Sequence, residues 1–169
     1  MCIRDRGYTA GQYLELVHYA KAKMGSALSI TSDVIVGFPG ETYEEFQDTL
    51  SLVKAVGATS LFTFIYSPRQ GTPAAKMEQV SKAVKEERAR RAAAVAEEMH
   101  RSYLEGCVGR TYPVLFEQPK NGKFFGHAPN YMEVLVDGAE LHNALRTVRI
   151  TDVDGEALLG EIVEQEAET

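Results

Sequence analysis

The chain has 169 residues, of which 44% are hydrophobic and 25% are charged, as in ordinary globular proteins. No stretch approaches the roughly 18 apolar residues of a membrane-spanning helix, and the N-terminus lacks the apolar core of a signal peptide, which excludes a transmembrane protein and disfavours secretion. The two cysteines, Cys2 and Cys107, are too few for a disulfide framework or a site of several local cysteines, and they favour a reduced setting. Cys107 follows a predicted helix, where we interpret it as a small buried residue.

The charges divide unevenly along the chain, whose 18 Lys and Arg and 24 Asp and Glu give a net charge of −6. Residues 1–105 carry 13 of each sign, whereas residues 106–169 carry 5 basic and 11 acidic residues. An acidic surface repels nucleic acid at long range. An RNA site in the second part would therefore rely on shape and base stacking, with its few basic residues gathered on one face.

Two helix–strand pairs are predicted in the first part of the chain. Thr9-x-x-Gln12 and Thr42-x-x-Glu45 are capping boxes, which satisfy backbone N–H groups at the start of a helix. The apolar run over 34–36 is typical of a strand buried on both faces, as in a parallel sheet. The expected elements are a helix from Thr9 to Gly25, a strand over Leu28–Phe38, a helix from Thr42 to Gly57 and a strand over Leu61–Tyr66. Their alternating order and short links favour parallel strands with right-handed crossovers.

A long helix separates this part from a region of short strands. After a loop over Ser67–Ala75, the spacing predicts a helix from about Ser81 to Leu104, with one stripe that includes Val84 and Arg88. Period-two segments then predict strands at Thr111–Glu117, Lys123–His127, Tyr131–Asp137, Leu145–Thr151 and Leu158–Val163. Five short strands in about 55 residues favour a small closed barrel, with a domain boundary near residue 106.

The first candidate for a binding segment is Asp33-Val-Ile-Val-Gly-Phe-Pro-Gly-Glu-Thr42, in which a predicted strand ends and a helix begins. In parallel α/β folds, ligands bind at the carboxyl ends of strands, and two glycines would let the backbone approach a ligand closely. The alternative is a tight strand-to-helix turn, with Pro39-Gly40 in the middle of a type II turn. The segment is no phosphate loop, because it matches neither GxGxxG nor GxxxxGK.

The second candidate begins where the next predicted strand ends, in the segment from Tyr66 to Pro73. Arg69 could bind a carboxylate or phosphate through its planar guanidinium. The alternative is a rigid surface loop that carries a solvated arginine.

The third candidate lies in the predicted barrel, from Lys123 to Tyr131. Aromatic and amide side chains beside a basic residue can stack on bases and read their edges. A barrel must also fill its own interior, so at least one of Phe124 and Phe125 should belong to the core. For His127, a structural hydrogen bond is the alternative to an RNA contact.

Three stretches resemble the radical-SAM tRNA methylthiotransferases: Arg6-Gly-Tyr-Thr9, Thr31-Ser-Asp-Val-Ile-Val-Gly-Phe-Pro-Gly-Glu-Thr42 and Tyr66-Ser-Pro-Arg-Gln-Gly-Thr-Pro-Ala-Ala75. The strand-rich part is similar to the C-terminal TRAM domain of that family, at Gly126-His-Ala-Pro-Asn-Tyr131, Leu141-His-Asn143 and Leu158-Leu-Gly-Glu-Ile162. GFPGET followed by YSPRxGTPAA is specific in combination. The resemblance extends from about Arg6 to Val163.

The resemblance implies an α/β fold in three parts. These are the C-terminal portion of a radical-SAM partial (β/α) barrel at 1–80, a connecting long helix at 81–105 and a small all-β TRAM, OB-like barrel at 106–169. The GHxPNY and LHN stretches look most like the MtaB-type branch, which methylthiolates C2 of N6-threonylcarbamoyladenosine at tRNA position 37. The MiaB branch, which acts on isopentenyl-adenosine, ranks second. Ala128 stands where we expect threonine in this family, which is a small departure.

The resemblance also implies S-adenosylmethionine and two [4Fe–4S] clusters as cofactors of the full-length enzyme. The N-terminal cluster domain of the family and its Cys-x-x-x-Cys-x-x-Cys loop are absent from this sequence, so we expect no metal in this chain, and we expect the isolated chain to be inactive. It resembles the last third or so of a larger enzyme, and no catalytic residue can be named in it. The residues that would face S-adenosylmethionine are Asp33, Gly37, Phe38, Gly40, Ser67 and Arg69. Those that would contact tRNA are Arg110, Lys123, Phe124, His127, Asn130 and Tyr131.

Two other hypotheses remain beside this one. The chain could be a stand-alone RNA-binding TRAM module without catalysis, or part of an unrelated α/β barrel enzyme. For the methylthiotransferase hypothesis we expect a cytoplasmic protein whose partner is tRNA at adenosine 37, and neither DNA nor a membrane. The open edges of a partial barrel favour aggregation of the isolated chain.

Overall fold

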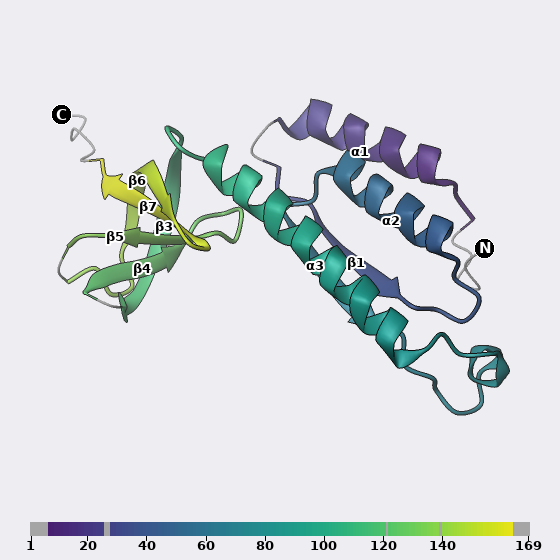
Figure 1. The fold of residues 1–169 in the computed structure, drawn as a ribbon. Coiled ribbons are helices and arrows are strands. Elements are labelled where there is room, and N and C mark those ends of the chain that lie inside the picture. The colour runs from purple at the N-terminus through teal and green to yellow at the C-terminus, as the bar shows by residue number, and fades with distance from the viewer. Residues whose placement is uncertain (1–6, 26–27, 121, 139, 164–169) are drawn as a thin grey trace. The chain divides into compact units, whose positions relative to one another are not determined.

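A computed structural model of the chain describes residues 7–25, 28–120, 122–138 and 140–163. It divides into two units, Met1–Met99 and His100–Thr169, each with its own core (Figure 1). Cys2, the start of the resemblance at Arg6 and the acidic residues after 163 lie outside the described residues.

Both predicted capping boxes are confirmed. Helix α1 (Ala10–Met24) begins after Thr9, whose hydroxyl accepts from the Gln12 amide at 3.2 Å while the Gln12 side chain accepts from the Thr9 amide at 2.8 Å. Helix α2 (Tyr43–Val56) begins in the same way after Thr42, with Glu45 in the role of Gln12. Gly57 ends α2 in the left-handed conformation that glycine adopts without strain.

Strands β1 (Thr31–Val36) and β2 (Ser60–Ile65) pair in parallel, as predicted, with Ile35 opposite Phe64. The prediction of a strand buried on both faces is wrong, because Ile35 is 46% exposed. One face of the sheet packs through Val34 and Val36 against α2 and the long helix α3 (Lys82–Glu105). Since side chains alternate along a strand, the other face carries Ile35, Phe62 and Phe64, and it is open in the described structure.

Helix α3 matches the predicted range, but its buried stripe begins one residue later than expected. Val84 is 40% exposed, whereas Lys85 is 8% exposed. From Lys85 the stripe continues through Arg88 and Ala92 against the core of the first unit. The last turn of α3 belongs to the second unit, where Leu104 is fully buried, so the division falls at Met99 and His100.

The second unit is a closed five-stranded barrel, which confirms the predicted architecture of this part. The strands are β3 (Thr111–Lys120), β4 (Lys123–His127), β5 (Glu133–Val136), β6 (Leu145–Asp154) and β7 (Ala157–Ile162), in the order β3-β4-β5-β7-β6. Among the pairings of the described barrel residues, that of β5 with β7 is parallel and the others are antiparallel. The core includes Val114, Phe116, Val134, Val148, Ile150 and Leu158. Gly126 lets β3 approach closely, because a Cβ there would lie 2.3 Å from the Leu115 carbonyl oxygen.

The stability of this barrel should decrease at alkaline pH, because Tyr112 is held in its neutral form in the folded state. Its hydroxyl lies 3.5 Å from the buried Cys107 Sγ, and burial, with that thiol, raises the pKa of Tyr112 from 10.0 to about 12. An unfolded tyrosine ionises near pH 10 while the folded one stays neutral. The contribution of Tyr112 to stability should therefore be fully present below pH 10 and be lost as the pH rises from 10 to about 12.

Urea unfolding of the wild type and of Tyr112→Phe, on both sides of pH 10, checks this expectation. The variant should lose less stability above pH 10 than the wild type does. Equal losses in the two proteins would contradict the prediction.

Candidate cofactor and RNA sites

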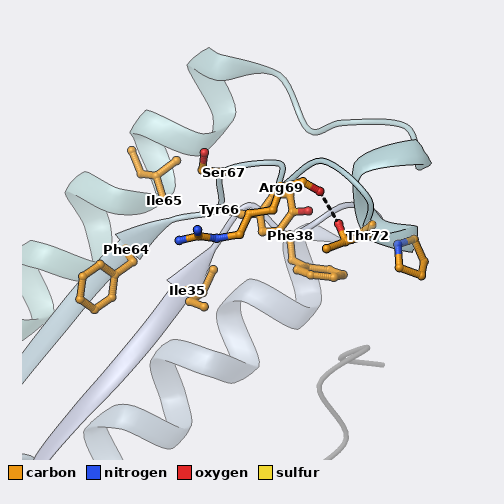
Figure 2. Close-up of a pocket in the computed structure, with 10 residues that line it drawn as sticks. Ile35, Phe38, Phe64, Ile65, Tyr66, Ser67, Arg69 and Thr72 are labelled. Carbon is orange, nitrogen blue, oxygen red and sulfur yellow. Dashed lines mark hydrogen bonds between the residues drawn. The ribbon is translucent and has the colours of Figure 1, made fainter.

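A hollow opens where β1 and β2 end, which is where the sequence predicts a ligand site (Figure 2). Its volume is about 520 Å³. It is lined by Ile35, Phe38, Phe64, Ile65, Tyr66, Ser67, Arg69, Thr72, Pro73 and Ala74. Three of the six predicted cofactor-facing residues, Phe38, Ser67 and Arg69, thus come together at one end of the sheet.

Arg69 supplies the charge of this hollow. Figure 2 shows its guanidinium reaching back from the loop over the open sheet face, toward Phe64 and Ile35. The backbone of the loop is held by the Thr72 hydroxyl, which donates to the Arg69 carbonyl at 2.8 Å. No ion pair joins Arg69 to another residue of the described structure. The arrangement leaves the guanidinium available for a carboxylate or phosphate.

The loops that follow the two strands meet through aromatic rings. The Phe38 and Tyr66 rings pack edge to face, with centroids 4.9 Å apart. A second hollow, of about 370 Å³, shares Ile35 and Phe38 with the first and adds Gly40. Four of the predicted residues, Phe38, Gly40, Ser67 and Arg69, therefore line two hollows that share Ile35 and Phe38.

Gly37 and Asp33 lie elsewhere. Gly37 is buried, and a Cβ there would lie 2.5 Å from Lys85 Cγ, so the close approach that glycine permits here is made by a helix side chain rather than by a ligand. Asp33 lines a separate hollow of about 320 Å³ with Tyr13 and Thr49. The structure does not bring these two residues to the hollow beside Arg69.

Sequence reasoning missed the residues that hold the two loops in place. Glu41 closes the first loop, and Lys85 and Arg88 reach it and the second loop from α3. The sequence did contain a signal for Lys85. It lies three residues before Arg88, which the periodicity had placed on the buried stripe, and residues three apart share a helix face.

In the barrel, the predicted RNA-contacting residues divide into exposed and structural ones. Tyr131 is 85% exposed and has a left-handed φ of 64°. His127 is exposed and bonds through Nδ1 to Glu117 Oε1 at 2.7 Å, as a hydrogen-bonding histidine should. Phe124 is partly buried against the core, which confirms that one of the two phenylalanines is structural.

Asn130 must be removed from the RNA-contacting set, because it is buried at 6% exposure. Its Nδ2 donates to the Tyr103 hydroxyl at 3.0 Å, and its Oδ1 accepts from the Met132 amide at 3.3 Å. The side chain therefore fixes the turn before β5 rather than facing a partner.

Most of the few basic residues of the barrel form ion pairs. Lys123 binds Asp137 at 2.7 Å and Lys120 binds Glu133 at 2.7 Å, while Arg149 lies 3.6 Å from Glu161. Such exposed pairs contribute little stability and can rearrange toward a phosphate. Arg110, the remaining predicted cation, is partly buried.

The described residues contain no group of three or more His, Cys, Asp or Glu placed to hold a metal. Cys107, the one cysteine among them, is 1% exposed in the barrel core and accepts from Tyr112. A thiol in this position does not fit an iron–sulfur cluster, which needs several converging thiolates. None of the helices in the described ranges is both long and apolar enough to cross a membrane.

Comparison with curated proteins gives strong matches, although no family model matches the chain. The chain is 43% identical over 164 residues to the tRNA-2-methylthio-N(6)-dimethylallyladenosine synthase of Symbiobacterium thermophilum, which covers 94% of this chain and 35% of the relative. It is 42% identical to the enzymes of the same name from Desulforamulus reducens and Anoxybacillus flavithermus, with 94% and 96% of this chain covered. This chain is a homologue of part of these methylthiotransferases. It spans about a third of their length.

The homologues support the methylthiotransferase resemblance and correct its finer detail. The MtaB-type assignment receives no support, because the relatives' names match the alternative, the MiaB type.

Proposed function

We propose that this chain forms part of a tRNA methylthiotransferase of the MiaB type, which makes 2-methylthio-N6-dimethylallyladenosine in tRNA. The observation that carries the proposal is the similarity over nearly the whole chain to synthases of that name. The two loops that meet at Phe38 and Tyr66 support it, because both of the most specific motifs of the sequence contribute residues to the same hollow. The protein is then cytoplasmic and acts at adenosine 37.

The hollow beside Arg69 fits S-adenosylmethionine. Its apolar wall of Ile35, Phe38 and Tyr66 suits a planar adenine, and the guanidinium of Arg69 suits a carboxylate. When bound and reductively cleaved, the cofactor would supply the radical that abstracts the adenine C2 hydrogen, whereas the sulfur of the methylthio group would come from a separate donor. The residues of this chain would bind and orient it, with Ser67 and Gly40 at the rim. The described donors do not fit an iron–sulfur cluster, so the cysteines that hold the clusters would lie in another part of the enzyme.

The barrel would act as the TRAM module that holds the tRNA. Tyr131 offers an exposed ring for base stacking, and His127 and Lys123 offer polar groups on β4. The ion pairs described above explain how an acidic module can still present cations, since a phosphate can replace a surface carboxylate as partner.

A chimera tests the proposal. This chain would replace the matching 35% of the Symbiobacterium thermophilum synthase, in a bacterial strain that lacks its own enzyme. Mass spectrometry of tRNA nucleosides should then detect 2-methylthio-N6-dimethylallyladenosine. The control is the same host sequence with the segment deleted, which should give no product.

Other products or none would overturn the proposal. The 2-methylthio derivative of threonylcarbamoyladenosine would favour the MtaB type. An inactive chimera, together with tight tRNA binding by the chain itself, would favour the stand-alone RNA-binding module.

A further inference from the structure

Helix α3 presents two buried cations to the loops that follow β1 and β2. Lys85 is 8% exposed and Arg88 is 7% exposed, although lysine and arginine are seldom buried unless they are paired. They lie three residues apart on one face of α3, and each reaches a different loop.

Arg88 holds the loop after β1. Its NH1 donates to the Glu41 carboxylate and, at 3.1 Å, to the Glu41 backbone carbonyl. The same carboxylate oxygen, Oε2, accepts from the Gly37 amide at 2.8 Å. Arg88 therefore fixes both ends of the segment that carries Phe38 and Gly40.

Lys85 holds the loop after β2. Its Nζ donates to the Tyr66 carbonyl at 3.2 Å and lies 5.1 Å from the centroid of the Tyr66 ring. Its methylene chain packs against Gly37, where no larger residue fits. The Tyr66 amide in turn donates to the Val36 carbonyl at 2.9 Å, which ties this loop back to β1.

We propose that Lys85, Arg88 and Glu41 act as positioning residues, and we call this set the loop lock: it fixes the backbones from which Phe38 and Tyr66 project into the ligand hollow. A merely stabilising role would need only the charge pair. The contacts instead converge on loop backbone groups, namely the Gly37 amide and the carbonyls of Glu41 and Tyr66. The identity of the ligand, S-adenosylmethionine, rests on the proposed function. The contacts of the loop lock do not depend on it.

Hydrogen exchange of the 169-residue chain tests the geometry without any ligand. In Arg88→Met the Glu41 carboxylate loses its partner and should turn toward solvent, so the Gly37 amide should exchange at least about tenfold faster than in the wild type. Arg90→Met is the matched control, because Arg90 pairs with Glu87 at the surface, with 76% of its side chain exposed. It should leave the exchange of Gly37 unchanged.

Glu41→Gln keeps an acceptor for the Gly37 amide and is the milder variant, in case Arg88→Met unfolds the unit. A neutral side-chain amide binds the Arg88 guanidinium more weakly than a carboxylate does, so the Gly37 amide should exchange about threefold faster than in the wild type. Equal Gly37 exchange in the wild type, Arg88→Met and Glu41→Gln would overturn the lock.

Kinetics of the active chimera test what the lock positions. Lys85→Met keeps the apolar stem beside Gly37 but loses the bond to Tyr66, so KM for S-adenosylmethionine should rise about tenfold while kcat changes by less than about threefold. Lys82→Met, at an exposed surface ion pair on the same helix, should change neither. A fall in kcat with unchanged KM would overturn the positioning role. An inactive unmutated chimera would instead reject the proposed function and leave the exchange test intact.

Discussion

Replacing Phe46 by alanine should lower the free energy of unfolding of the first unit by about 3–5 kcal/mol. Phe46 is fully buried on α2, where it packs in one cluster with Val36 of β1 and Ala92 of α3. The guanidinium carbons of Arg88 and Arg91 each lie 5.5 Å from its ring centroid. The substitution removes both the core contact and the aromatic face under Arg88, so the loss should fall at the large end of core truncations.

Urea unfolding followed by the helical circular dichroism signal measures this loss, because α1, α2 and most of α3 belong to the first unit. Tyr43→Ala is the matched control on the same helix. Tyr43 is 55% exposed although Arg91 lies over its ring at 5.4 Å, so the change should cost less than about 1 kcal/mol. Similar losses for the two variants would show that Phe46 is not the centre of this core.

Replacing Asn130 by leucine should destabilise the barrel by about 1–3 kcal/mol, since it leaves the buried Met132 amide without its acceptor and removes one partner of the partly buried Tyr103 hydroxyl. The Tyr103 hydroxyl loses its donor and the Met132 amide loses its acceptor. Thermal unfolding of the variant gives the magnitude.

The neighbouring residue gives the contrast that separates structure from binding. Tyr131→Ala should change the stability by less than about 0.5 kcal/mol, because the ring is almost wholly exposed. The same change should weaken tRNA binding by about tenfold if the ring stacks on a base. The opposite pattern, a stable Asn130→Leu protein that no longer binds tRNA, would return Asn130 to the RNA-contacting set.

Local sequence signals predicted the elements that depend on local chemistry. Thr9 and Thr42 begin helices because each capping box is complete within four residues. The parallel pairing of β1 with β2 and the barrel strands followed from the order and period of the apolar segments.

Side-chain placement depended on contacts between distant segments, and there the sequence misled. Val84 is the apolar residue of its turn, so periodicity assigned it to the buried stripe, yet Lys85 is buried because Gly37 and the Tyr66 carbonyl receive it. Asn130 looks like a base-reading amide until Tyr103, 27 residues earlier, supplies its partner. The exposure of Ile35 could not be read from an apolar run, since the run does not say how many faces are covered.

The closed order β3-β4-β5-β7-β6 leaves every strand of the barrel with two neighbours. A closed sheet has no strand edge with unpaired backbone groups that a strand of another chain could join. Strands β1 and β2, by contrast, each have a single neighbour in the described structure. The barrel, taken together with the last turn of α3 that packs in its core, can therefore be exchanged between related chains without leaving an unpaired strand edge, which the two-stranded sheet cannot.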